Sequence, residues 1–161
     1  MALEGMRLVK EYLPRAYNDG SDLEARAHMM SAAAMGATAF QKGLGAIHAL
    51  SHPIGAIYHT HHGTTNAVCM PAVLQFNKPA IADRFDMVAG YLGISGGFDG
   101  FCAFVDDLNA RMGIPKTLTD LGVTSLDVDR VVAGALNDPS TGGNPMEMTA
   151  ENTRELLSKI A

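Results

Sequence analysis

The stretch from Phe40 to Asn77, FQKGLGAIHALSHPIGAIYHTHHGTTNAVCMPAVLQFN, collects imidazole side chains and has no carboxylate. His48 and His52 are four residues apart, so a helix would place both rings on one face, about one turn apart. His62 lies beyond a predicted turn, and a turn after a helix can return a residue over the same spot. The stretch therefore predicts a histidine cluster built on two consecutive helices. In all it holds five of the chain's six histidines: His48, His52, His59, His61 and His62.

Two chemical roles are open to such a cluster. Imidazole is a good ligand for Fe, Zn, Cu and Ni, so a divalent transition metal is one prediction. Imidazole also titrates near neutral pH and can relay a proton. The competing interpretation is that a His-x-x-x-His pair on a glycine-rich helix is part of the core or of the surface, because this spacing alone is common. A metal also needs three or four protein ligands.

The other histidines of the chain, and the absence of Asp and Glu from residues 40–77, reduce the number of candidate ligands and of candidate enzyme classes. His59 and His61 are predicted to be residues of a polar turn, which holds a ligand poorly, and His28 a plain residue of an earlier helix. The pair His48 and His52 is not the zincin motif, because no Glu follows the first histidine. A small metal hydrolase is a poor alternative, because no nearby Asp or Glu could act as its base.

Helical patterns joined by short loops extend on both sides of this stretch and predict an all-α, bundle-like domain. Pro14 should end or kink the first helix, Pro53 should break the helix with the histidine pair, and Pro71 should kink or split the next one. No alternating strand pattern is found. The predicted helices cover residues 2–12, 21–40, 44–57, 64–76, 79–92, 101–112, 124–136 and 149–160.

Particular residues predict how some of these helices begin and pack. Ser21 and Glu24 have the spacing of a capping box. Thr124 and Asp127 are both candidate caps of the next-to-last helix, and Thr149 is the candidate cap of the last one. The small residues of 32–37, AAAMGA, leave little side-chain bulk. Another helix could approach closely there, so the second helix is predicted to be buried.

Composition excludes several classes of protein. The chain has 161 residues, of which 47% are hydrophobic and 18% charged, and this suits one globular domain with a core. The formal charge is −5 and no basic patch stands out, which argues against nucleic acid as a partner. No apolar stretch has the length of a membrane span, and no signal peptide is recognised. Cys69 and Cys102 are predicted to be buried, reduced thiols of a cytoplasmic protein.

The run GLGAIHALSHPIGAIYHTHHGTTNAVCMPAVLQFN resembles the signature of the iron-containing alcohol dehydrogenases. The shared pattern is His-Ala-x-x-His, Gly-Ala, His-Gly, Asn-Ala and Pro-x-Val before Phe-Asn. The closing segment NPMEMTAENTRELL also looks like that of the family, so the resemblance covers almost the whole chain. It implies the carboxy-terminal helical domain of a two-domain enzyme whose other domain binds the nucleotide.

The resemblance assigns roles residue by residue. His48 and His62 match the two metal-binding histidines of the family's helical domain, and His52 matches a histidine linked to proton transfer or substrate contact. The metal is Fe²⁺ or Zn²⁺, and NAD(P) exchanges hydride with a small alcohol or carbonyl substrate. The wording of the motif is closest to the branch that acts on maleylacetate or similar small carbonyl compounds.

The sequence also departs from the family pattern. It has no Gly-Gly-Gly-Ser dinucleotide loop near its start, and no Asp-x-x-x-His helix to supply the other two ligands. Residues 1–161 are therefore expected to be a single, incomplete metal-binding helical domain without the nucleotide-binding domain. The remaining ligands should lie outside this chain, and the isolated fragment should be inactive. The alternative function is a non-catalytic, self-associating helical module, and a homo-oligomer is possible under either hypothesis.

Overall fold

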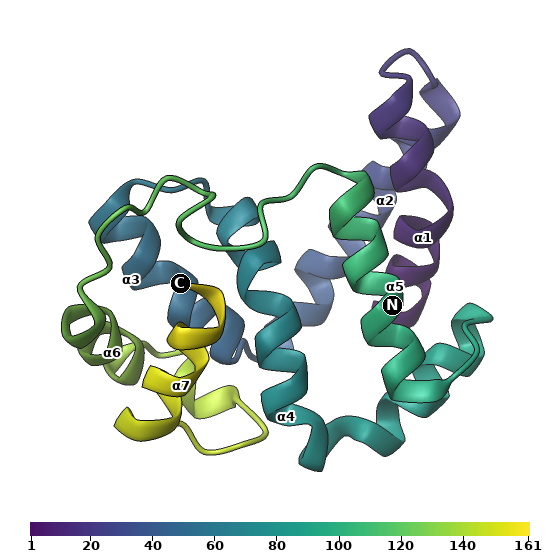
Figure 1. Ribbon diagram of the computed structural model, residues 1–161. Coiled ribbons are helices and arrows are strands. Elements are labelled where there is room, and N and C mark those ends of the chain that lie inside the picture. The colour runs from purple at the N-terminus through teal and green to yellow at the C-terminus, as the bar shows by residue number, and fades with distance from the viewer. The chain divides into compact units, whose positions relative to one another are not determined.

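In the computed structural model, which describes residues 1–161, every regular element is a helix (Figure 1). The predicted all-α fold is thus confirmed. No single helix is long and apolar enough to cross a membrane. The bent pair of α4 and α5 has the length and composition of a membrane span only when the two helices are taken together. The α-helices are α1 (Ala2–Asn18), α2 (Leu23–Ala39), α3 (Ala46–Tyr58), α4 (His62–Leu92), α5 (Gly97–Arg111), α6 (Val128–Asn137) and α7 (Ala150–Ile160); short 3-10 turns are η1 (Phe40–Lys42) and η2 (Thr141–Gly143).

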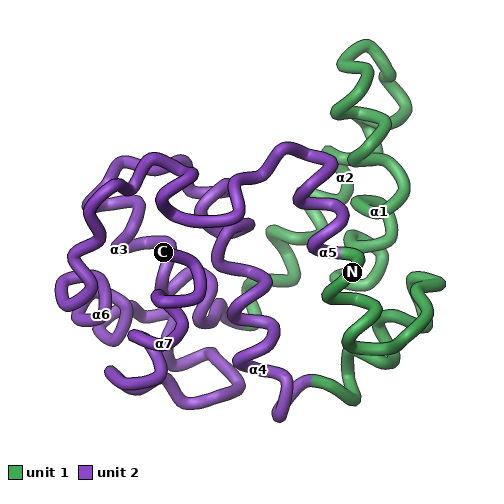
Figure 2. The backbone as a smooth tube through the Cα atoms, in the orientation of Figure 1, with its two compact units in different colours: residues 1–42, 82–104 green, residues 43–81, 105–161 purple.

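The chain forms two compact units (Figure 2). Unit 1 consists of Met1–Lys42 and Ala82–Phe104, and unit 2 of Gly43–Ile81 and Val105–Ala161. Unit 1 therefore contains α1, α2, the second part of α4 and the first part of α5. Unit 2 contains α3, α6, α7 and the remaining parts of α4 and α5, and with them most of the histidines. The expected single domain stays a prediction.

In unit 1, α1 and α2 form an antiparallel hairpin. A Cβ atom at Gly5 would lie 3.5 Å from the Cβ of Met35, so the two helices approach closely near the open end of the hairpin. Nearer the turn, the rings of Tyr12 and His28 stack with their centroids 4.0 Å apart. His28 therefore packs between helices, as expected of a plain helix residue.

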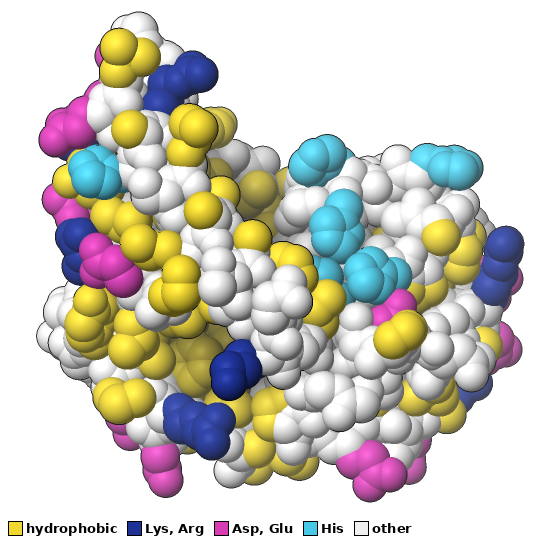
Figure 3. All heavy atoms as spheres, turned by 180° about the vertical axis from the view of Figure 1, so that it is seen from behind, with side chains coloured by type: hydrophobic (Ala, Val, Ile, Leu, Met, Phe, Trp, Pro, Cys, Tyr) yellow, Lys and Arg dark blue, Asp and Glu magenta, His cyan; other side chains and the backbone are white.

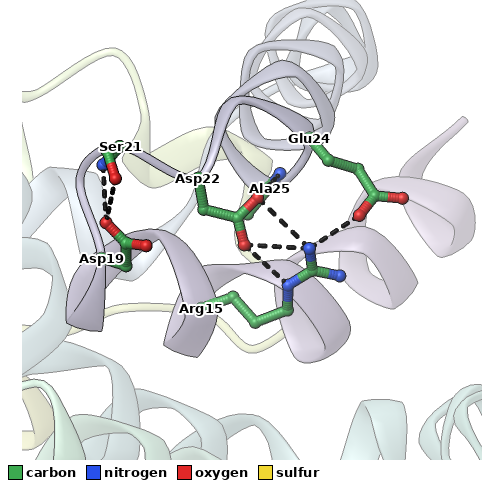
Figure 4. Close-up of polar contacts among 6 residues, drawn as sticks. All are labelled: Arg15, Asp19, Ser21, Asp22, Glu24 and Ala25. Carbon is green, nitrogen blue, oxygen red and sulfur yellow. Dashed lines mark hydrogen bonds and ion pairs between the residues drawn. The ribbon is translucent and has the colours of Figure 1, made fainter.

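Charged side chains at the turn of this hairpin fix the start of α2 (Figure 4). Asp22 accepts a hydrogen bond from the Ala25 amide at 2.9 Å, which makes it the N-cap of α2. The Arg15 guanidinium donates to both Asp22 oxygens at 3.0 and 3.2 Å, and to Glu24 at 2.7 Å. The Ala25 amide, and then Arg15, lower the pKa of Asp22, so the cap stays an ionised acceptor. The predicted cap at Ser21 is wrong, because the helix begins after the next residue.

The prediction that α2 is buried is also wrong. Only Ala25 and Ala32 of this helix are buried. The face opposite these two residues carries an exposed apolar stripe, on which Leu23 and Met30 are 78% and 76% exposed. The small residues of α2 do permit another helix to pack closely, but the helix that packs against α2 is α1 alone. The stripe consists of Leu23, Ala27, Met30, Ala34 and Ala37.

Unit 2 contains a continuous hydrophobic core to which α3, α4, α6 and α7 contribute. Its centre is fully buried, and burial of each large aliphatic side chain contributes about 1.5–3 kcal/mol to folding. A Cβ atom at Gly134 of α6 would lie 2.7 Å from the Pro53 Cβ of α3, so α3 and α6 are in close contact at this point. The most buried large side chains are Leu50, Ile54, Leu118, Val131, Leu156 and Leu157.

Several predicted helix boundaries at proline are wrong. α1 continues past Pro14 to Asn18, and α3 is continuous through Pro53. The two helices predicted on either side of residue 77 are a single helix, α4, that contains Pro71 and Pro79. The caps of α6 and α7 at Asp127 and Thr149 are confirmed, and Thr149 forms a full capping box with Asn152.

The continuity of α4 at Pro71 has a visible cause. Proline has no amide hydrogen, so the carbonyl of Ala67 loses its usual partner four residues later. The Asn109 side chain of α5 donates to this carbonyl at 3.1 Å. A side chain from another helix thus replaces the missing backbone hydrogen bond.

Candidate metal centre

The start of α3 is held by the segment that follows α6. Asn144 accepts a hydrogen bond from the Ala46 amide at 3.0 Å and so caps α3 in place of a residue of its own. Gly45 directly precedes the helix. A side chain at this position would disturb the cap, because a Cβ atom there would lie 2.9 Å from the Asn144 Oδ1. The Asn144 and Asn77 side chains also exchange two hydrogen bonds of 2.9 and 2.8 Å. The Phe76-Asn77 end of the histidine motif and the Asn144-Pro145 step of the closing segment thus meet at the start of α3.

The turn between α3 and α4 reverses the chain with a left-handed residue. His59 has φ +57° and ends α3, a conformation that is uncommon for residues other than Gly and Asn. His61 precedes α4 and caps its start, because its Nδ1 accepts from the Thr64 amide at 3.3 Å. Thr65 ties the turn together through hydrogen bonds to Thr60 at 2.8 Å and to the His61 carbonyl at 2.9 Å. As predicted, His59 and His61 are turn residues, and each has a backbone role.

This turn brings His48, His52 and His62 together. The ring centroids are 5.6 Å apart for His48 and His52, 5.3 Å for His48 and His62, and 5.4 Å for His52 and His62. Histidine side chains gather on one face of the molecule (Figure 3). The cluster lies wholly within unit 2 and joins α3 to the first residue of α4.

The Nε2 atoms of two of these rings converge on one point. The Asn66 Nδ2 lies 3.4 Å from His48 Nε2 and 3.1 Å from His62 Nε2. An amide NH₂ group can only donate, so both Nε2 atoms must be unprotonated acceptors in this arrangement. The Asn66 Oδ1 is buried and has no hydrogen-bond partner. Two imidazole lone pairs therefore point to one place beside an unsatisfied oxygen.

The surroundings of His48 favour its neutral form. Partial burial, and then the proximity of His52 and His62, lower the pKa of His48 below its ordinary value, while the carboxylate of Asp138 acts in the opposite direction. Neutral imidazole is the form that binds a metal. The electrostatic environment therefore supports the role that the geometry indicates.

His52 has a different partner. Its Nδ1 lies 2.8 Å from the Oδ2 of Asp138, whose side chain is only 11% exposed. Asp138 comes directly after α6, and its other oxygen accepts from the Ser140 amide at 2.8 Å. Burial would raise the pKa of Asp138, but hydrogen bonds from Ser140 and His52 outweigh it and lower the pKa. This carboxylate is thus a fixed anion beside the cluster.

These residues fit a metal ion only in part. Two neutral imidazoles with convergent Nε2 atoms form a suitable pair of donors. No group of three or more His, Cys, Asp or Glu side chains in the chain is placed to hold a metal by itself. The donor set therefore matches part of a transition-metal site, and a bound metal would need further ligands.

Sequence reasoning found the histidine cluster and missed two of its neighbours. Asp138 is separated from His52 by 86 positions, so no local pattern links them. The sequence around the histidines has no carboxylate, but the fold brings the Asp138 carboxylate next to His52. Asn66 had a usable signal, because it follows His62 by four residues and must lie on the same face of α4.

Comparison with known proteins gives one family. The family model described as "Fe-containing alcohol dehydrogenase family, C-terminal" matches residues 1–161. A 4-hydroxybutyrate dehydrogenase of Cupriavidus necator is 42% identical over 99% of this chain and 44% of its own length. An NAD-dependent methanol dehydrogenase of Bacillus methanolicus is 35% identical over 97% of this chain and 43% of its own length.

A solved structure shows the same fold. The crystal structure of a 1,3-propanediol oxidoreductase superposes with a TM-score of 0.93 and 30% sequence identity, over 99% of this chain and 44% of the other. The chain therefore spans less than half the length of the relatives that it matches.

Proposed function

Because the chain belongs to the iron-containing alcohol dehydrogenase family over all of its 161 residues, we propose that it is the helical metal-binding part of an iron-dependent, NAD(P)-linked alcohol dehydrogenase. His48 and His62 are two of the metal ligands in this proposal, and His52 is the catalytic residue. The parent enzyme oxidises small alcohols or reduces the corresponding carbonyl compounds.

The observation that carries the proposal is the convergence of His48 Nε2 and His62 Nε2 on the Asn66 amide nitrogen. An unprotonated Nε2 that accepts from this amide is also the form of imidazole that Fe²⁺ or Zn²⁺ requires. Neutral imidazole accepts both ions, so either one fits this pair. This chain spans 44% of the length of the 4-hydroxybutyrate dehydrogenase, and in this proposal the remaining ligands and the nucleotide-binding domain lie outside the part that it spans.

The bound metal would supply Lewis-acid polarisation of an alcohol or carbonyl oxygen while NAD(P) exchanges hydride. The chain's own residues have three tasks beside it. His48 and His62 bind through Nε2, His52 transfers a proton or contacts the substrate, and Asp138 holds His52 in place.

The names of the relatives support the substrate class. They describe enzymes acting on 4-hydroxybutyrate and on methanol, both small alcohols. We propose a small alcohol, aldehyde or ketone as the substrate, with maleylacetate-like carbonyl compounds included. A cytoplasmic location without nucleic-acid or membrane partners completes the proposal.

Metal uptake tests the ligand assignment. We would titrate the chain with Zn²⁺ and follow the imidazole resonances by NMR, because two ligands alone bind weakly. His48→Ala and His62→Ala should each abolish the shifts at the other ring. His59→Asn is the matched control, because Asn tolerates the left-handed conformation, and it should leave the titration unchanged. Uptake that is the same in all four proteins would remove both ligands from the proposal.

A turnover assay tests the proposal that this chain holds only part of the active site. The chain alone, supplied with Fe²⁺ or Zn²⁺, NAD⁺ and 4-hydroxybutyrate, should produce no NADH. Clear turnover would show that the chain holds a complete active site, and the proposal of an incomplete enzyme would then be wrong.

A further inference from the structure

The contact between His52 and Asp138 determines more than the position of the ring. An ionised carboxylate has only acceptor atoms, so the atom that faces it at 2.8 Å must donate. The donor is His52 Nδ1, which therefore carries a hydrogen. In the neutral ring, Nε2 is then unprotonated. This is the tautomer that free histidine disfavours in water.

Asp138 is itself fixed by its surroundings. The Ser140 amide donates to its second carboxylate oxygen at 2.8 Å, and the Thr141 amide donates to its backbone carbonyl at 3.0 Å. Gly143, a little further along, packs so closely on the Leu44 carbonyl that a Cβ atom there would overlap it. The first two contacts fix the carboxylate within its own loop, and the contacts of Gly143 with Leu44 and of Asn144 with the Ala46 amide hold that loop against the start of α3.

The exposure of the two side chains is unequal. The His52 side chain is 40% exposed and that of Asp138 only 11%. The carboxylate is therefore enclosed behind a ring that remains partly open to solvent. Such an arrangement suits a group that acts through another residue, because the side chain of the cluster to which Asp138 is hydrogen-bonded is His52.

We propose that Asp138 is a positioning residue that holds His52 in the Nδ1–H tautomer and leaves His52 Nε2 as the proton-accepting atom. The catalytic meaning of this assignment rests on the proposed function. In alcohol oxidation, the hydroxyl proton goes to His52 Nε2 and the hydride on the carbinol carbon goes to NAD(P)⁺. The alcohol is oxidised to the carbonyl compound and NAD(P)⁺ is reduced. The resulting imidazolium is paired with the Asp138 carboxylate through its Nδ1–H.

The test reads the tautomer directly in the 161-residue chain. Long-range ¹H–¹⁵N correlation spectra of ¹⁵N-labelled protein distinguish protonated from unprotonated ring nitrogens, and a His52→Gln variant assigns the signals. In the wild type, His52 Nδ1 should show the protonated shift and Nε2 the unprotonated one. In Asp138→Ala the two shifts should exchange, because the ring returns to the form preferred in water.

The control is Asp129→Ala, which removes an exposed carboxylate of α6 that pairs with Arg154. The His52 shifts should not change in this variant. The proposal is overturned by a wild-type His52 in the Nε2–H form, by an Asp138→Ala protein that keeps the Nδ1–H form, or by an equal change in the control. No metal or nucleotide is present in this measurement, so failure of the proposed function would not alter its outcome. Conversely, an Nε2–H form of His52 would leave the metal ligands untouched.

Discussion

His48, His52 and His62 are the same residue type, and the roles proposed for them differ because their hydrogen-bond partners differ. The Nε2 atoms of His48 and His62 face one amide nitrogen, whereas Nδ1 of His52 faces a carboxylate. Spacing in the sequence predicts that the three rings meet. It cannot predict which ring nitrogen has which partner, because Asp138 comes from a distant loop. The roles of the three histidines were predicted from the family resemblance, and they stay a proposal.

Asn66 offers a way to strengthen the metal site. In Asn66→Asp, a carboxylate oxygen would replace the amide nitrogen that now lies between the two Nε2 atoms. Three protein ligands make a far better site than two, and we expect Zn²⁺ binding to tighten by about tenfold, or ~1.4 kcal/mol. Isothermal titration or chelator competition measures the difference. Asn66→Ala is the control without a new ligand, and equal affinity in the two variants would contradict the geometry described above.

At the scale of helices, the sequence predicted where helices exist better than where they end. Pro53 was expected to break its helix and Pro71 to kink or split the next one, yet α3 and α4 continue through these residues. At Pro71 the reason lies outside the helix, in the Asn109 side chain that satisfies the Ala67 carbonyl. Local propensity cannot reveal a donor 42 residues away.

Asn109→Leu tests this compensation. The Ala67 carbonyl would lose its donor, and an unsatisfied buried carbonyl costs about 1–3 kcal/mol. A cavity of about 400 Å³ that both residues line can admit water, so we expect a loss of unfolding free energy near the lower end, about 1 kcal/mol. Urea denaturation measures it. Asn137→Leu, at an exposed site on α6, should change the stability much less; an equal loss would show that Asn109 has no special role.

The contact between α3 and α6 gives a second prediction at this scale. Ala normally stabilises a helix relative to Gly by about 1 kcal/mol. In Gly134→Ala, however, the new Cβ would lie 2.7 Å from the rigid Pro53 ring, and overpacking of this kind costs about 1–3 kcal/mol. We expect a net loss of unfolding free energy, measured by urea denaturation.

Gly55→Ala on α3 is the matched control for this substitution. Its nearest neighbour, the Thr60 carbonyl oxygen, lies 3.7 Å from the added Cβ, which is an ordinary contact. This variant should be as stable as the wild type or more so. If Gly134→Ala were stabilised to the same extent, the close contact of the two helices would be wrong.

For the whole molecule, the two units differ in the surface that they expose. All seven large hydrophobic side chains that are strongly exposed belong to unit 1. α2 was expected to be buried because its residues are small and apolar, and its sequence does have that character. The sequence shows that one face of α2 is apolar. It does not show whether the surface that would cover this face belongs to the same chain or to another. The seven residues are Met1, Tyr17, Leu23, Met30, Phe40, Met87 and Tyr91.

This surface predicts that the isolated chain self-associates. Contiguous exposed apolar patches favour association, and in a pure sample the available partner is a second copy. We expect the mean mass from light scattering to rise with concentration. Met30→Glu, in the middle of the stripe on α2, should shift the population toward monomer. Ser125→Glu adds the same charge at an exposed position of unit 2 and should have little effect; equal effects would exclude the stripe as the interface.

X-ray absorption of the Zn²⁺-loaded chain tests the central assignment most directly, because it counts the imidazole nitrogens around the metal. We predict two of them at about 2.0–2.1 Å, with solvent oxygens completing the shell. The double variant His48→Ala/His62→Ala should lose both. An identical spectrum in the wild type and the double variant would contradict the proposal that these two histidines form part of a dehydrogenase metal site.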